Sequence, residues 1–134
     1  MKDLKRSKKR RLDILREKIS GAATPNDLNK IAKELEAHGM KLLKKGKTAE
    51  GREYSKGAGK VYKMEANMLH TPGTVITDPE VKIKAARARY NAGRMHELRN
   101  ELNDAVREYN LALNLDSNNP EYTLKLADVY ERQG

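Results

Sequence analysis

The chain has 134 residues, of which 37% are apolar and 35% charged, and its formal net charge is +9. It contains no Cys, Trp or Phe, which excludes disulfides, thiolate metal sites and cysteine nucleophiles and leaves Tyr and aliphatic side chains to build the core. No apolar run is long enough to span a membrane, and no apolar stretch follows the basic N-terminus as it would in a secretory signal. We therefore expect one domain, or one domain with a tail, in a reducing cytoplasmic compartment.

Positive charge is concentrated at the front of the chain. Residues 1–18 hold nine Lys or Arg and three Asp or Glu. Residues 19–79 hold ten Lys or Arg and seven Asp or Glu, and residues 80–134 hold nine of each kind. The cations of the densest run are Lys5, Arg6, Lys8, Lys9, Arg10 and Arg11. We predict a basic N-terminal arm or helix over residues 1–23, joined to a helical body.

The arm has two interpretations. Six charges without an intervening acid favour contacts to phosphates, and therefore salt-dependent binding to an RNA or DNA backbone. The arm carries no aromatic residue for base stacking and no bulky apolar anchor for a membrane surface. Further cations that extend the patch are Lys41, Lys44, Lys45 and Lys47. The alternative is a solubilising tail.

A helical hairpin is predicted over residues 24–71. Thr24 and Asp27 fit a variant of the capping box, with Pro25 between them at the first helical position. Gly46 is expected to end this helix and Thr48 to cap the next. No β-strand pattern appears anywhere in the chain, so the fold class is all-α.

Residues 72–78 are predicted to be a linker, and residues 79–134 a second hairpin followed by one terminal helix. The first helix is expected to begin at Pro79 behind a cap at Thr77 or Asp78 and to run to about Ala92, with a turn at Gly93. A long helix is then expected from Met95 to Leu115, because apolar residues recur at heptad spacing. These residues are Leu98, Leu102, Ala105, Tyr109 and Ala112. The segment "DSNNP" breaks this helix and caps the last one.

A weak internal repeat runs through these helices. A small residue is followed seven positions later by Gly at Gly39/Gly46, Ala86/Gly93 and Ala127/Gly134. Each pair is expected to mark the end of the first helix of a hairpin.

Residues 104–134 resemble the tetratricopeptide repeat (TPR) family. The small–aromatic–small pattern of its second helix is matched by Ala105, Tyr109 and Ala112, and the first helix of a following repeat by Leu126, Ala127, Tyr130 and Gly134. Ser117 stands where the family usually has Pro, and the missing Trp marks a divergent relative. The resemblance implies helical hairpins stacked as a short TPR-like array, with a concave surface that binds proteins or peptides and no catalysis.

No constellation in the sequence points to an enzyme. The segment "GKT" at residues 46–48 lacks the earlier Gly of a phosphate-binding loop, and the three His are isolated from one another. We therefore predict no catalytic residues, no metal and no cofactor. The preferred function is a non-enzymatic interaction or scaffold module. The alternative is a small basic component of a nucleoprotein assembly that grips RNA or DNA backbone through its arm.

Two protein-binding surfaces are predicted from the repeat geometry. First-helix side chains would line a groove for an acidic or C-terminal carboxylate segment, namely Lys84, Arg87, Asn91 and Lys125. The alternative is an ordinary solvated helix face. The terminal helix would complete its packing with a second copy or a partner protein, through Leu124, Leu126, Val129 and Tyr130.

Overall fold

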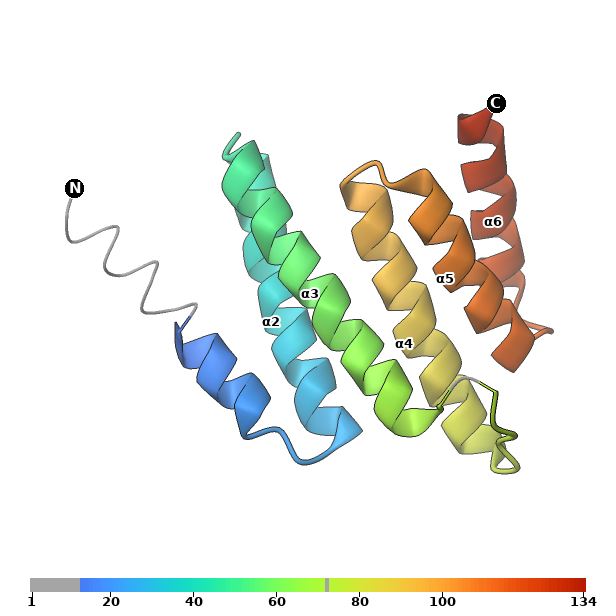
Figure 1. Cartoon of the computed structure of the whole chain (residues 1–134). Helices are drawn as coiled ribbons and strands as arrows, with labels where there is room; N and C mark the ends of the chain where they lie inside the picture. Colours follow the sequence, from blue (N-terminus) through green and yellow to red (C-terminus); the bar gives the residue numbers. More distant parts are fainter. Residues whose placement is uncertain (1–12, 72) are drawn as a thin grey trace, which may run out of the picture.

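The computed structural model describes residues 13–71 and 73–134, and it is helical throughout apart from turns and one linker. Residues 13–20 are helical and are followed by five further helices. These are α2 (Pro25–Lys44), α3 (Thr48–Leu69), α4 (Pro79–Leu98), α5 (Leu102–Leu115) and α6 (Pro120–Gln133). No strand occurs among the described residues. The predicted all-α class and stacked arrangement are confirmed (Figure 1).

The helices α2, α4 and α6 begin as the sequence predicts, each with Pro in its first turn behind a capping side chain. Thr24 Oγ1 accepts the Asp27 backbone N–H at 3.1 Å, and the Asp27 carboxylate accepts the Thr24 backbone N–H at 3.2 Å. Asp78 and Asn119 cap the other two helices in a similar way. The prediction for α3 was wrong, because Thr48 is its first helical residue and Lys47 at the cap position makes no side-chain cap bond.

Both hairpin turns have the same construction. Gly46, with φ of 80°, follows α2, and Asn100, with φ of 58°, follows α4. In each turn the backbone N–H of the following residue donates to the carbonyl five residues before it, at 2.9 Å. This bond satisfies a carbonyl group near the end of the helix. Asn is the residue that tolerates this left-handed conformation best after Gly.

The predicted turn at Gly93 was wrong. Helix α4 continues through Gly93 to Leu98, and the heptad seam is therefore divided between two helices, with Leu98 on α4 and its other members on α5. Gly93 serves close packing instead, because a β-carbon there would lie 2.5 Å from a ring carbon of Tyr109. The connection that the sequence placed at Gly93 is made by Asn100.

The first helices and the turns of the two hairpins match position by position, although α3 has 22 residues and α5 has 14. Helices α2 and α4 are both 20 residues long, and α3 follows α2 after the same short turn by which α5 follows α4. Gly39 thus corresponds to Gly93, and Gly46 to Asn100, so the predicted pairing of Gly46 with Gly93 was wrong. Gly39, like Gly93, faces the second helix of its own hairpin: a β-carbon there would lie 3.2 Å from Tyr54 Cβ.

Each helix packs mainly against its neighbours in sequence, from α2 to α6 (Figure 1). One core lies between residues 13–20, α2 and α3 and also takes in Ala92 and Met95 of α4. The second core lies between α4, α5 and α6, around Tyr90, Tyr109 and Tyr122. Helix α4 therefore supplies side chains to both cores. The predicted division at residues 1–23, 24–71, 72–78 and 79–134 stays a prediction.

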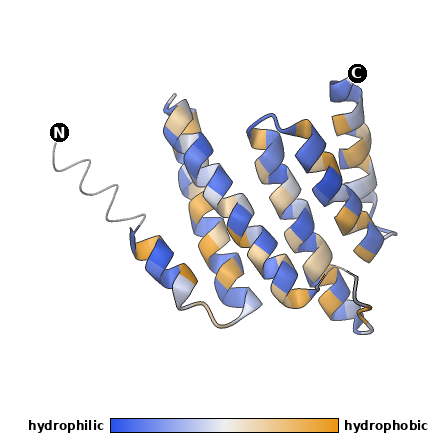
Figure 2. Ribbon diagram, in the orientation of Figure 1, coloured by the Kyte–Doolittle hydropathy of each residue, from blue (hydrophilic) through white to orange (hydrophobic). Residues whose placement is uncertain are grey.

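Hydrophilic residues interrupt every helix (Figure 2). Over residues 13–71 and 73–134, none of the helices combines the length and the hydropathy that crossing a membrane requires.

Candidate functional site

The six cations of the predicted arm, from Lys5 to Arg11, lie outside the described residues. The predicted groove residues do lie within them, on α4 and α6. Lys84 and Arg87 are exposed, Asn91 is buried, and Lys125 is partly exposed. Arg87 and Lys125 have different partners, namely Glu121 and Glu97.

Arg87 is held by residues of α4 and α6. Its Nη1 lies 3.0 Å from Glu121 Oε2. Its guanidinium stands over two rings, 5.3 Å from the centroid of Tyr90 and 5.2 Å from that of Tyr122. The cation therefore helps to join α4 to α6.

A hollow of about 380 Å³ lies between the first helices of the stack. Its lining comes from α2 (Met40), α4 (Arg94, Met95, Glu97 and Leu98) and α6 (Lys125 and Arg132). Lys125 is thus the predicted groove residue that lines it. Met40 and Leu98 expose apolar surface there, between three cations.

Arg94 is fixed at the α2 side of the hollow. Its Nη2 lies 2.7 Å from Glu36 Oε2, and its Nη1 donates to Asn91 Oδ1 at 3.0 Å. The Tyr62 hydroxyl donates to the same glutamate at 2.7 Å. Burial works against the charged guanidinium, but Glu36 outweighs it and raises the pKa of Arg94.

Glu97 organises the α6 side of the hollow, with its side chain only 11% exposed. Arg132 Nη1 lies 2.6 Å from one carboxylate oxygen and Lys125 Nζ 3.3 Å from the other. Burial alone would raise the pKa of Glu97, but hydrogen bonds from Tyr109, Arg132 and Lys125 outweigh it and lower the pKa. One carboxylate therefore positions two cations at the hollow, and Arg132 also lies 3.9 Å from Asp128 Oδ2.

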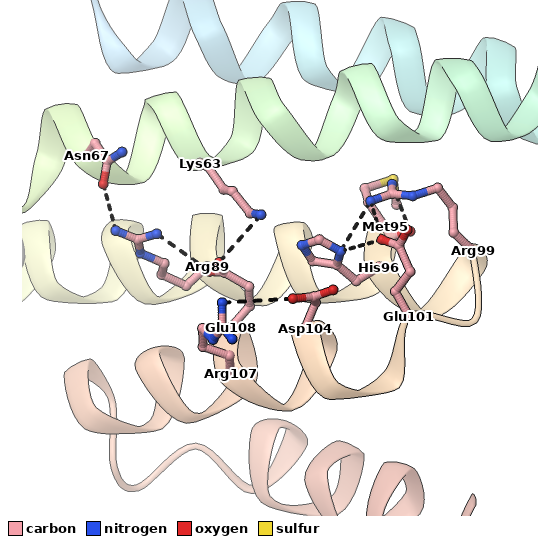
Figure 3. A network of polar contacts seen from close by, with 10 residues as sticks. All are labelled: Lys63, Asn67, Arg89, Met95, His96, Arg99, Glu101, Asp104, Arg107 and Glu108. Atoms are coloured by element: carbon pink, nitrogen blue, oxygen red, sulfur yellow. Dashed lines mark hydrogen bonds and ion pairs between the residues drawn. The ribbon is translucent and has the colours of Figure 1, made fainter. Parts of the chain in front are cut away.

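A second polar network connects α3, α4 and α5 (Figure 3). Arg89 of α4 donates to Asn67 Oδ1 at 2.7 Å and lies 3.5 Å from Glu108 Oε2. Lys63 of α3 lies 3.8 Å from the other oxygen of Glu108. Arg89 and Glu108 are both buried, so this network fixes how the second hairpin sits on the first. Sequence reasoning missed the network because its members lie on three different helices and share no local spacing.

One group of potential metal ligands occurs among the described residues. Single ligand atoms of His96, Glu101 and Asp104 lie within 4.8 Å of one another. The Arg99 guanidinium already occupies this position, with Nη2 2.7 Å from Glu101 Oε1 and 3.1 Å from His96 Nδ1 (Figure 3). Hydrogen bonds with Arg99 and His96 lower the pKa of Glu101 to about 2. A fixed cation at this distance disfavours a metal ion.

The predicted interface residues of α6 fall into two groups. Leu126 and Val129 are buried in the core shared with α4 and α5. Leu124 and Tyr130 are 71% and 51% exposed. Any interface formed by this helix would therefore use Leu124 and Tyr130, and its occupation by a second copy or a partner stays a prediction.

The family model for the TPR repeat matches residues 93–134, from Gly93 through α5 and α6. No curated protein matches the chain. TPR repeats are typically binding modules and not catalysts, and they commonly mediate contacts between proteins. The repeat match and the stack of helices fit a TPR-like helical repeat protein.

Proposed function

We propose that the chain is a non-enzymatic interaction module that holds an acidic peptide segment in the hollow between α2, α4 and α6. The supporting observation is the lining itself, in which Arg94, Lys125 and Arg132 surround the apolar side chains of Met40 and Leu98. Peptide sites commonly combine an apolar anchor with charges that fix orientation.

The charges of the hollow indicate the chemistry of the ligand. The lining itself holds three cations and one carboxylate, Glu97. Glu36 and Asp128 pair with Arg94 and Arg132 from outside the lining. A carboxylate on the peptide would meet donors that are already oriented, while an aliphatic side chain next to it would cover Met40 and Leu98. The alternative remains a solvated helix face.

Selection from a random peptide library on the immobilised full chain tests this proposal. We expect enrichment of peptides with an acidic residue beside an aliphatic one. A selected peptide should lose about tenfold or more in affinity with Leu98→Ser or Lys125→Gln, which corresponds to about 1.4 kcal/mol. The matched control is Lys82→Gln, an exposed change outside the hollow. Equal affinity for all variants would show that this face is only solvated.

A further inference from the structure

The net positive charge of the described residues lies in one segment, residues 41–60. This segment holds seven Lys or Arg and two acids, for a net charge of +5. The remaining described residues hold 14 Lys or Arg and 16 Asp or Glu, for a net charge of −2. The excess charge therefore belongs to the tip of the first hairpin and the first part of α3. The tip lies at the end of the helices opposite residues 73–78 (Figure 1), and Lys56 and Lys60 lie farther along α3, beside Leu15 and Ile19.

All seven cations of this segment are exposed, and together they form what we term the hairpin surface: Lys41, Lys44, Lys45, Lys47, Arg52, Lys56 and Lys60. No ion pair joins any of them to another residue of the described ranges. Most other Arg side chains of the fold are paired, as Arg87, Arg89, Arg94 and Arg132 are. The hairpin surface therefore gathers seven cations that have no ion-pair partner among the described residues.

The geometry of α3 gives this surface length and direction. Arg52, Lys56 and Lys60 recur every four residues on one helix face, about 6 Å apart at a rise of 1.5 Å per residue. From Lys47 to Lys60 the surface extends about 20 Å along the helix. That length matches about six nucleotides of one duplex strand at 3.4 Å each.

The remaining side chains of the segment favour a phosphate backbone over other anions. No large apolar side chain between residues 41 and 60 is exposed, so nothing there would insert into a membrane. Tyr54, the aromatic residue of the segment, is buried and cannot stack on a base. Lys is a point charge, which suits contacts to phosphates that do not depend on sequence.

From these observations, we infer that the hairpin surface binds the phosphodiester backbone of double-stranded nucleic acid, without sequence preference. It lies on hairpin residues outside the predicted arm of residues 1–23, and its lysines do not line the hollow between α2, α4 and α6. The inference does not depend on the proposed peptide site.

Salt titration of binding to a mixed-sequence DNA duplex and to an RNA duplex tests the inference on the full chain. The test variant combines Lys44→Gln, Lys56→Gln and Lys60→Gln. Each lost phosphate contact should flatten the slope of log K against log salt by about 0.9, so the slope should fall by about two to three. Both duplexes should respond alike.

The matched control combines Lys30→Gln, Lys33→Gln and Lys82→Gln, which remove the same charge from positions outside the hairpin surface. Its slope should stay close to that of the unchanged chain. Equal flattening in both triple variants, or none in the test variant, would overturn the inference. So would a test variant that loses binding to vesicles containing phosphatidylserine but keeps duplex binding, since the surface would then serve a membrane.

Discussion

Gly93 of α4 lies directly against the ring of Tyr109 of α5, where a β-carbon would come within 2.5 Å of Cε1. Tyr109 is fully buried, and its hydroxyl donates to Glu97, so the ring has little room to move. We expect Gly93→Ala to lower the free energy of unfolding by about 1–3 kcal/mol through overpacking. Urea denaturation would measure the change.

Gly57→Ala is the control for this substitution. A β-carbon at Gly57 would meet Leu35 at 3.8 and 3.9 Å, which is ordinary van der Waals contact. The alanine should therefore stabilise α3 by about 0.5–1 kcal/mol through helix propensity. If both alanine variants shifted the free energy of unfolding equally, the ring contact would not be the cause.

Gly46 and Asn100 occupy equivalent turns, so we expect them to tolerate exchange. Asn100→Gly should leave the free energy of unfolding unchanged or slightly higher, and Gly46→Asn should cost little. Asn100→Val should lower it by about 1–2 kcal/mol, because a β-branched residue resists the left-handed conformation. Thermal unfolding of the three variants measures these changes. An Asn100→Val variant as stable as the unchanged chain would contradict the prediction.

Glu108 is expected to be the most sensitive charge in the fold. Glu108→Ala would leave Arg89 buried without its carboxylate, at a cost of about 3–5 kcal/mol. Glu121→Ala breaks the more exposed pair with Arg87 and should cost about 1 kcal/mol or less. Chemical denaturation of both variants tests the ranking. Similar losses would mean that the buried network contributes no more than a surface ion pair.

The stability of the second hairpin should depend on acid pH through Glu101. Hydrogen bonds with Arg99 and His96 lower the pKa of its carboxyl from the ordinary 4.5 to about 2 in the folded chain. A lowered pKa stabilises the fold above about pH 4.5, and this contribution is lost as the pH falls towards 2. The difference in unfolding free energy between the unchanged chain and Glu101→Gln should therefore shrink between pH 6 and pH 2.5. A constant difference would contradict this assignment.

Helix α6 is predicted to associate through its exposed apolar side chains. Leu124→Glu combined with Tyr130→Glu should reduce the mass of any assembly measured by light scattering at high micromolar concentration, without unfolding the chain. Val129→Glu is unsuitable for this test because Val129 is fully buried. Two results together would show that the helix is not an interface. The unchanged chain would be a monomer, and the double variant would bind a protein partner with the same affinity as the unchanged chain.

Local chemistry made part of the fold predictable from sequence. The caps at Thr24 and Asn119 were found, and that of α4 was narrowed to Thr77 or Asp78, because a cap and its N–H group lie close together in the chain. The role of Gly93 could not be found in that way. A Gly permits both a turn and a close approach, and its partner Tyr109 lies on the next helix.

The candidate site was less predictable for a related reason. Lys125 was identified and Arg94 and Arg132 were missed, while Arg87, a predicted groove residue, does not line the hollow. All four are cations on first helices, so residue type does not separate them. The cations that line the hollow and Arg87 form ion pairs with different carboxylates. That pairing depends on how the helices are positioned relative to one another.

The main helix contacts follow the order of the chain, from α2 against α3 to α5 against α6. Such a fold has low contact order, and chains of this kind close short loops first and fold quickly. A hairpin can nucleate alone and then template its neighbour, so unfolding is expected to start at an end helix and proceed inwards. Helix α4, which supplies both cores, would then be the last to lose its partners.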